Sequence, residues 1–478
     1  MKTTMHLIWL RNDLRLDDNT AVHAACERGP ALALWLVTPG QWQAHDEAAC
    51  KVDFWLRNLR ALRERLDAVN IPLLIRHIDT WGEAADAVLS VCRQHKVETV
   101  HWNDEYGINE EARDAAVRAA LEEAGIGAHN HLDQLLFKPG SVLTRSGHYF
   151  QVFGQFRRTC MERLLDSLPA LVPKVRKQAP LSIRSSQLPK HVEGFETPPE
   201  SLRAHWPAGE AEAQHRLRRF LDETAEEYDR LRDLPAKHGT SQLSAYLAAG
   251  VISVRQCLHE AVGRNRGDLD SGNKGVQTWI TELLWREFYK HIMTGYPRVS
   301  RHRAFRPHTE ALPWRHAPEE LKAWQEGRTG FPLIDAAMRQ LLATGWMHNR
   351  LRMITAMFLT KNLLIDWREG ERHFMRHLID GDFASNNGGW QWSASTGTDS
   401  VPYFRIFNPV TQSRRFDPEG RFIGQWIPEI DHLFKNIHLP PPDSDIFKDN
   451  VYMRPIVDLS KSRERALEAF KGLPRSHG

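Results

Sequence analysis

The sequence predicts an α/β N-terminal domain with a doubly wound parallel sheet, followed by an all-α domain. Two observations carry this prediction. Short apolar runs alternate with helical patterns up to about residue 130, and helical patterns dominate after a proline-rich stretch. We therefore expect an α/β domain at 1–132, an interdomain linker at 133–208 and an all-α domain at 209–478.

The first domain is predicted from strand-like runs separated by helical patterns such as 54–69. The runs are His6–Leu10, Ala31–Val37, Ile71–Ile75 and Val97–Trp102. Neither a G-x-G-x-x-G after the first run nor a phosphate-binding G-x-x-x-x-G-K-[ST] occurs. Ligands of open α/β sheets bind at the carboxyl ends of the strands. Candidates there are His45, Asn109 and Glu110, although solvated loop side chains explain the same residues.

The linker is predicted from seven prolines between Pro169 and Pro207, in a stretch without a sustained period. After Ala211 the helical pattern begins, and strand signals are weak from there on.

Composition limits the possible classes. The 478 residues are 41% hydrophobic and 26% charged, as in soluble multi-domain proteins. Apolar runs stay far below the ~20 residues that span a bilayer, and the N-terminus lacks the apolar stretch of a signal peptide. Five scattered cysteines argue against a disulfide framework or a zinc site and favour a cytoplasmic location. The net charge of +3 neither requires nor excludes nucleic acid. Sixteen Trp against eight Tyr indicate either functional indoles or an aromatic-rich core.

Polar chemistry lies at helical spacing in the second domain. Glu282, Trp285, Arg286 and Tyr289 share one helix face, and Asn349 shares a face with Met353. A partly exposed Glu–Arg pair beside a half-buried Trp is the structural alternative for the first group. Hydroxyls at Thr240, Ser241 and Ser244 precede a helix, where they either bind a cofactor phosphate or cap the helix.

The segment 380–408 combines two acids, two adjacent Asn, a Gly pair and two Trp. Asn386, Asn387 and Gly388 disfavour a helix, because Asn competes with its own backbone and Gly tolerates positive φ. We therefore expect a polar turn that grips a planar cofactor, or alternatively a Trp-capped surface turn.

Basic residues cluster in the same half of the chain. The run 298–306 has four Arg and one His without an acid, and further Arg follow among aromatics. This composition is typical of surfaces that contact phosphates and stack bases, and also of solvated basic faces.

Three stretches carry a resemblance to a known family. They are W-L-R-N-D-L-R-L-D-D-N at 9–19, W-Q-E-G-R-T-G-F-P-L-I-D-A-A-M-R-Q-L-L-A-T-G-W-M-H-N-R-L-R-M at 324–353, and D-G-D-F-A-S-N-N-G-G-W-Q-W at 380–392. Together they resemble the DNA photolyase/cryptochrome family, and within it the bacterial class I cyclobutane pyrimidine dimer photolyases. The similarity runs from about residue 5 to about 430.

The resemblance implies light-driven repair of UV-damaged DNA by a monomer that holds FAD in its helical domain. Matching positions imply an FAD site of Tyr228, Thr240, Ser241, Leu243, Ser244, Arg286, Asn349, Arg352, Asp380, Asp382 and Asn386. Arg352 would pair with Asp380, and Asn386 would approach flavin N5, where plant cryptochromes carry an acid. Photoreduction of the flavin is implied to use a relay of Trp390, Trp367 and Trp314.

The resemblance also implies a pocket for the pyrimidine dimer, with Glu282 and Asn349 as catalytic residues beside Asn386. Lesion and strand contacts are implied for Glu282, Trp285, Arg350, Met353, Trp392, Arg405 and Gln412. The six-four photolyases carry His at the positions of Asn349 and Met353, so this chain is similar to the dimer-specific branch. The alternative is a cryptochrome-type blue-light photoreceptor without repair. It is disfavoured because Asn386 is not acidic and only about fifty residues follow the last shared motif.

A second chromophore is implied for the N-terminal domain. His45, Asn109 and Glu110 match an antenna site for 5,10-methenyltetrahydrofolate. Relatives often carry Lys where this chain has Arg301, which keeps the positive charge but leaves 8-hydroxy-5-deazaflavin as the alternative.

Overall fold

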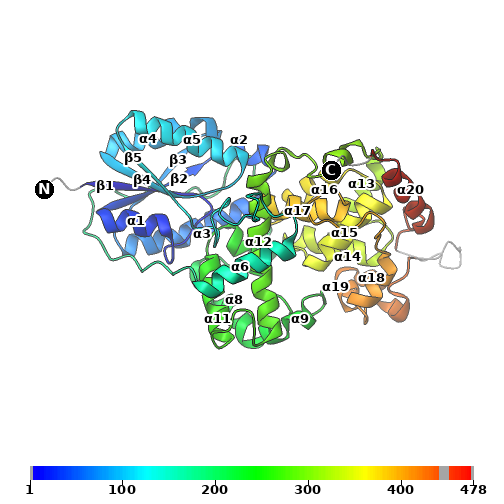
Figure 1. Cartoon of the computed structure of the whole chain (residues 1–478). Coiled ribbons are helices and arrows are strands. Elements are labelled where there is room, and N and C mark those ends of the chain that lie inside the picture. Colours follow the sequence, from blue (N-terminus) through cyan, green and yellow to red (C-terminus); the bar gives the residue numbers. More distant parts are fainter. Residues whose placement is uncertain (1–3, 441–451, 475–478) are drawn as a thin grey trace.

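A computed structural model describes residues 4–440 and 452–474 (Figure 1). Its one sheet is five-stranded, entirely parallel and ordered β3-β2-β1-β4-β5, and it confirms the expected doubly wound class. The strands are β1 (Met5–Leu10), β2 (Ala31–Val37), β3 (Leu73–His77), β4 (Val97–Asn103) and β5 (Gly127–His131). The helices of this domain are α1 (Thr20–Arg28), α2 (Pro39–Ala44), α3 (Ala49–Ala68), α4 (Ala84–His95) and α5 (Ile108–Glu123).

Alternation along β1 explains why helices cover both faces of the sheet. Leu7 and Trp9 belong to one apolar cluster, which also holds residues of α4 and α5. Ile8 and Leu10 belong to a second cluster, which holds residues of α1 and α3. Successive strand side chains point to opposite faces, so each face needs its own helical layer.

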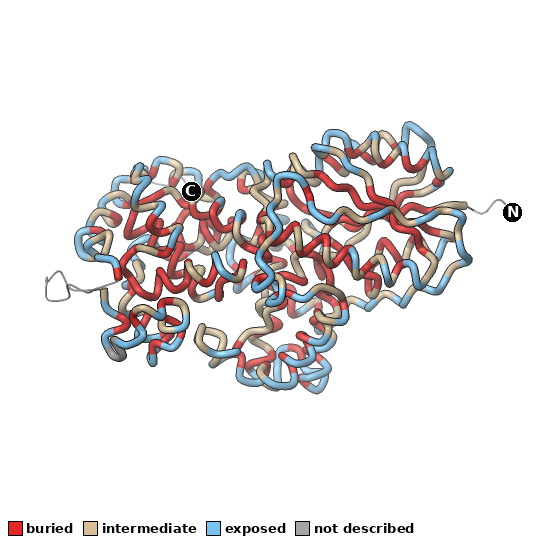
Figure 2. Tube along the Cα trace, turned by 180° about the vertical axis from the view of Figure 1, so that it is seen from behind, coloured by how far each residue is buried: buried red, intermediate tan, exposed pale blue. Residues whose placement is uncertain are grey.

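The segment expected as a linker, 133–208, contains two helices in the structure. They are α6 (Phe153–Asp166) and α7 (Glu200–His205). Phe153 of α6 stacks on Trp285 with ring centroids 3.6 Å apart, so α6 packs within the helical half. Residues 167–199 contain no helix or strand and run along the N-terminal domain, mostly exposed or half-buried (Figure 2). There Ser186 N donates to Leu73 O at 2.7 Å, which covers the edge strand β3.

The remaining described residues form a helical body beside the sheet domain (Figure 1). Its helices are α8 (Glu210–Glu223), α9 (Tyr228–Leu231), α10 (Ser244–Ala248), α11 (Val254–Arg264), α12 (Lys274–Gly295), α13 (Pro318–Gln325), α14 (Pro332–Thr344), α15 (Asn349–Met357), α16 (Trp367–Met375), α17 (Phe383–Ala394), α18 (Pro409–Phe416), α19 (Arg421–Trp426) and α20 (Leu459–Lys471). The expected all-α character is therefore confirmed for the described part of this half.

Candidate active site

A cavity of about 480 Å³ lies within the helical body. It is lined by the segments at α9 and α10 and by the helices α12, α15 and α17. The structure brings sixteen of the expected residues to its walls: Tyr228, Ser241, Leu243, Ser244, Glu282, Trp285, Arg286, Asn349, Arg350, Arg352, Met353, Asp380, Asp382, Asn386, Trp390 and Trp392. Residues that the family resemblance implied, from segments more than 160 residues apart, therefore line one cavity.

Helix α12 contributes one face of side chains to the cavity wall, including the carboxyl group of Glu282. Glu282, Trp285, Arg286 and Tyr289 all line the cavity, as their spacing predicts. Arg232 Nη1 donates to Glu282 Oε1 at 2.5 Å. Burial raises the pKa of Glu282, and the Arg232 charge opposes that rise. The carboxyl group is thus held in place by a neighbour that also moderates its proton affinity.

Helix α15 presents two arginines, each paired with an acid. Arg352 Nη2 lies 2.7 Å from Asp380 Oδ2, which confirms the expected pair. Arg350 Nη2 lies 2.8 Å from Asp233 Oδ2. His348 caps the helix because its Nδ1 accepts from Arg350 N at 3.2 Å, and burial lowers the pKa of His348 to about 4.

The segment with Asn386, Asn387 and Gly388 is not a turn, so the turn geometry that both sequence expectations assumed was wrong. It lies inside helix α17. Asp382 starts this helix by accepting from Ser385 N at 2.9 Å. Asn387 does not compete with its own backbone, because its Nδ2 donates to Glu371 Oε1 at 2.8 Å. Tertiary partners thus remove the reason for which these residues disfavour a helix.

Two contacts orient the cavity side of α17. Asn386 Nδ2 donates to the backbone oxygen of Glu371 at 3.0 Å, so its amide oxygen is free to face the cavity. Asp382 Oδ2 lies 2.5 Å from Lys290 Nζ. Although burial alone would raise the pKa of Asp382, Lys290 and Arg286 hold it well below the usual range. Asp382 is therefore a carboxylate at neutral pH.

The hydroxyl segment before α10 meets two indoles. Trp279 Nε1 donates to Ser241 Oγ at 3.4 Å, and Trp346 Nε1 donates to Ser244 Oγ at 3.3 Å. Because both hydroxyl oxygens accept from indoles, their own O–H groups are available as donors. Thr240 lies next to this wall but does not line the cavity.

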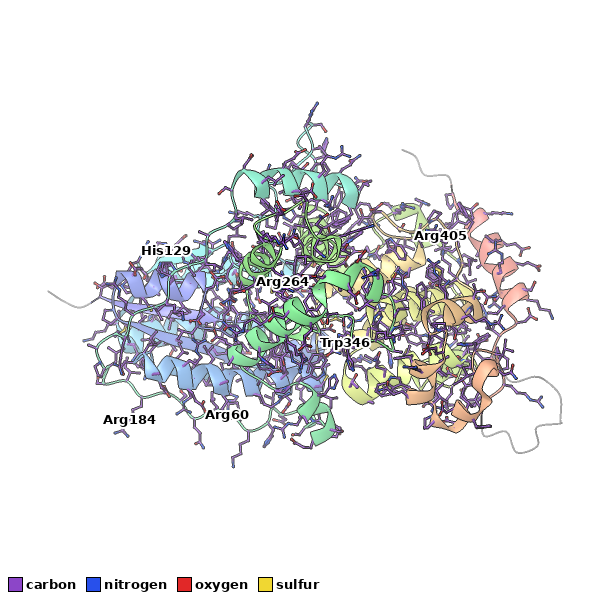
Figure 3. All side chains as sticks on the ribbon, turned by 90° about the horizontal axis from the view of Figure 1, so that it is seen from below. Arg60, His129, Arg184, Arg264, Trp346 and Arg405 are labelled. Atoms are coloured by element: carbon purple, nitrogen blue, oxygen red, sulfur yellow. The ribbon has the colours of Figure 1, made fainter. Side chains whose placement is uncertain are left out.

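The three tryptophans expected to form a relay belong to one apolar cluster and differ in burial. Trp390 lines the cavity, Trp367 is fully buried in the same apolar cluster, and Trp314 is half-buried at its edge. Arg405 and Gln412 lie outside the cavity. Figure 3 shows Arg405 projecting from the helical body, while Trp346 lies where the two halves meet.

The expected antenna residues form a separate site. Asn109 Nδ2 lies 2.9 Å from His45 Nε2, and the His45 ring stands edge-on to Trp81 with centroids 4.8 Å apart. Burial lowers the pKa of His45 and raises the pKa of Glu110. Arg301 is exposed, and the neighbouring Ser300 Oγ accepts from Ile108 N at 3.1 Å, which places this loop beside α5.

Several lining residues were missed from sequence, among them Arg232, Trp279, Phe374 and Ser385. Asp233, the partner of Arg350 beside the cavity, was missed as well. Arg232 lies four residues after Tyr228 and its guanidinium sits 5.4 Å from that ring, so i, i+4 spacing was an available signal. Nothing in the sequence distinguishes Phe374 and Trp279 from ordinary core residues.

The residues that the structure describes contain no group of three or more His, Cys, Asp or Glu placed to hold a metal ion. Among residues 4–440 and 452–474, no helix has the length and apolarity to cross a membrane.

Comparison with known proteins agrees with this architecture. Residues 6–174 match the family model described as DNA photolyase, and residues 279–472 match the FAD binding domain of DNA photolyase. The deoxyribodipyrimidine photo-lyase of Escherichia coli (strain K12) is 45% identical over 477 residues that cover 98% of each chain.

Solved structures give the same picture. A class III photolyase from Agrobacterium tumefaciens superposes with a TM-score of 0.87 at 34% identity, over 98% of both chains. A cryptochrome from Synechocystis reaches a TM-score of 0.88 at 26% identity, over 98% of this chain and 100% of its own. The two-domain fold and the matched FAD binding domain define the class: a flavoprotein with an α/β domain and a helical domain. The chain belongs to the DNA photolyase family.

Proposed function

We propose that the protein is a deoxyribodipyrimidine photo-lyase, which repairs cyclobutane pyrimidine dimers in DNA by light-driven electron transfer from FAD. One observation carries this proposal. A single cavity joins the Arg352–Asp380 pair and Asn386 to a second wall of Glu282, Trp285 and Trp392. Charged, amide and aromatic groups thus meet where a cofactor and a flat apolar lesion can touch each other.

The residues present fit FAD. Ser241 and Ser244 keep free O–H donors for phosphates, with Tyr228, Thr240 and Leu243 beside them. Arg286, Arg352, Asp380 and Asp382 supply charged partners for polar ring edges. When bound, FAD supplies the group that absorbs light and donates an electron.

The roles of the protein groups follow from their contacts. Arg352 and Asp380 form a nearly neutral pair at the cavity wall, which avoids an unbalanced buried charge. Asn386 is held by Glu371 so that it offers an acceptor to the cavity. Asn349, at the start of α15, is exposed and stands between the cofactor and lesion walls.

The lesion would enter the cavity as a flipped dinucleotide, at a cost of a few kcal/mol that is smaller for damaged pairs. Trp285, Met353 and Trp392 supply apolar walls, and Glu282 can hydrogen-bond a base edge. Arg350, Arg405 and Gln412 would contact the strand around it. The electron given to the dimer returns after both cyclobutane bonds break, so no oxidant or reductant is consumed.

A repair assay on UV-irradiated oligothymidylate tests this function. We expect blue light to restore the thymine absorption band with the reduced protein and not in the dark. The double variant Glu282→Ala, Asn349→Ala should lose this recovery, because both residues line the lesion wall. The control variant Glu98→Ala, at an exposed position in β4, should keep the light-dependent recovery. Absence of recovery from protein with bound, reduced FAD would reject the photolyase function.

The relay is tested by the Trp314→Phe variant. We expect flavin photoreduction in vitro to be at least about 10-fold slower, because Phe is far harder to oxidise than an indole. Trp426→Phe is the matched control, since Trp426 is another half-buried Trp at the edge of the same apolar cluster. Unchanged photoreduction in the Trp314 variant would remove Trp314 from the relay.

For the antenna we propose 5,10-methenyltetrahydrofolate at His45, Asn109, Glu110 and Arg301. The cavity at the carboxyl ends of the strands measures about 60 Å³, far below the ~300 Å³ or more of typical ligand pockets. Neither chromophore would fit inside it, so the proposed antenna would lie across the exposed side at Asn109. The absorption spectrum of purified protein mixed with either compound separates the two.

A cryptochrome-type photoreceptor without repair is the second candidate, because the fold also matches the Synechocystis cryptochrome. The repair assay decides between them, since only the photolyase restores the thymine band.

A further inference from the structure

A hydrogen-bonded chain runs from an exposed loop to the inner side of α17. His302 Nδ1 lies 3.0 Å from Glu371 Oε2, and Asn387 Nδ2 donates to Glu371 Oε1 at 2.8 Å. Gln391 Nε2 continues the chain by donating to Asn387 Oδ1 at 2.8 Å. The His302 side chain is 56% exposed whereas that of Glu371 is 2% exposed. A solvent-accessible imidazole is thus connected directly to a buried carboxylate.

The same carboxylate residue touches the cavity wall. The backbone oxygen of Glu371 accepts from Asn386 Nδ2 at 3.0 Å, and Asn386 lines the cavity. The neighbouring residue Asn387 binds the Glu371 side chain. Both consecutive amides of α17 therefore depend on one residue of α16.

The loop that carries His302 is fixed at several points. Arg368 Nε donates to His302 O at 2.7 Å, and Phe305 N donates to Gln391 Oε1 at 2.7 Å. On its other side Ser300 Oγ accepts from Ile108 N at 3.1 Å. The loop consequently bridges α5 of the sheet domain to α16 and α17. A change at His302 is transmitted to the cavity because the loop cannot simply move away.

Charges around His302 come from helix α16 and from the loop between α2 and α3. Glu371 and Arg372 lie on α16, and Asp46 lies on the loop between α2 and α3. The hydrogen bond to Glu371 raises the pKa of His302, while burial and Arg372 oppose the rise and Asp46 supports it. His45 is a further titratable neighbour. Histidine is the side chain whose charge changes nearest to physiological pH, and the contact with Glu371 favours the protonated form of His302.

We propose that His302 is a positioning residue for the flavin site, whose protonation state acts through Glu371 and the amides of Asn386 and Asn387 to set the flavin reduction potential. When His302 is protonated, its charge balances the Glu371 carboxylate. When His302 is neutral, Glu371 is a buried, unbalanced negative charge beside the cavity. An added negative charge disfavours a reduced, more negative cofactor, so the potential falls as His302 loses its proton. This inference rests on the proposed FAD-dependent function.

Two substitutions bracket this effect. Reduction of the flavin itself takes up a proton, so the midpoint potential falls with pH in every variant, and the effect of His302 is the difference between the curves. His302→Gln cannot carry the charge, so its potential should lie below that of the wild type at acidic pH and coincide with it at alkaline pH. His302→Lys keeps a positive charge up to about pH 10, so its potential should coincide with that of the wild type at acidic pH and lie above it at alkaline pH. The wild type should pass from the Lys curve to the Gln curve across one inflection. His316→Gln is the matched control, because His316 is exposed and lies outside the loop.

The experiment measures the midpoint potential of the flavin-loaded full chain between pH 5.5 and 9, together with the NMR titration of His302 in histidine-labelled protein. The NMR pKa of His302 should coincide with the inflection, and it should fall in Glu371→Gln. If the His302→Gln variant binds flavin and repairs dimers but keeps the inflection, this inference is overturned and the proposed function stands. A purified chain that binds no flavin overturns the proposed function as well.

Discussion

At the scale of single residues, the sequence predicted the position of Glu282 correctly but not the residue that binds its carboxyl group. Helical spacing places Glu282 on the face with Trp285 and Arg286, and all three line the cavity. The sequence did not reveal that Arg232 binds the carboxyl group at 2.5 Å. Since burial and Arg232 act on the pKa of Glu282 in opposite directions, its protonation depends on a residue fifty positions away.

Replacing Arg232 tests this dependence. In Arg232→Met the opposing charge is lost, so the pKa of Glu282 should rise further. Any step in repair rate that comes from Glu282 should therefore move to higher pH. The pH profile of dimer repair measures the shift. Arg230→Met is the control, because Arg230 pairs with the exposed Glu227 and should leave the profile unchanged. A pH profile of Arg232→Met identical to that of the wild type would show that Arg232 does not control the protonation of Glu282.

At the scale of elements, helix α17 exists because of its neighbours. A Cβ on Gly388 would lie 2.2 Å from Tyr289 Cδ1, so the Tyr289 side chain of α12 packs directly against the α17 backbone at this glycine. The glycine that sequence reasoning took as a turn signal instead permits two helices to meet. Local propensity therefore predicted the wrong element, because the benefit of close packing is not visible in the residues of one helix.

Two alanine substitutions at neighbouring positions check this explanation. Gly388→Ala should destabilise the protein by about 1–3 kcal/mol, because the new methyl group overlaps the Tyr289 ring. Gly389→Ala meets nothing within 4 Å and should gain up to about 1 kcal/mol of helix propensity. Free energies of unfolding from denaturant titration compare them. Equal values for both variants would contradict the role assigned to Gly388.

At the scale of the whole molecule, the two halves are joined by buried charges. Arg255 of α11 pairs with Asp18 at 3.0 Å and with Asp133 at 2.9 Å. Asp133 also pairs with Arg15 at 2.5 Å. Asp18 and Asp133 belong to the sheet domain, whereas Arg255 belongs to the helical body. If the two halves separated, Arg255 would lose both carboxylate partners, and Asp18 and Asp133 would lose this guanidinium.

The Arg255→Ala variant should be destabilised by roughly 3–5 kcal/mol, because it leaves two buried carboxylates without this partner. Arg264→Ala is the matched control on the same helix. Arg264 pairs with the exposed Glu226 near the surface, where such pairs contribute about 0–1 kcal/mol (Figure 3). Thermal unfolding measures both. A small effect of Arg255→Ala would mean that the network does not couple the two halves.

The sequence by itself determined the class of both halves, because apolar periodicity depends only on local spacing. It also determined single stripes of the cavity wall such as Glu282–Tyr289, which keep their geometry in any helix, whereas the other expected wall residues followed from the family resemblance. The sheet could not be predicted in full. β5 reads G-A-H-N-H without a strand pattern, and it is a strand because it pairs in parallel with β4.

Only the tertiary structure decided which residues satisfy each other. Arg232 with Glu282, Asn387 with Glu371 and Arg255 with Asp133 are contacts between elements distant in the chain. Buried polar groups need partners, but the chain does not state which of many donors and acceptors will meet. That choice is made by packing, when apolar faces bring the helices together and the remaining polar groups must pair across the contact.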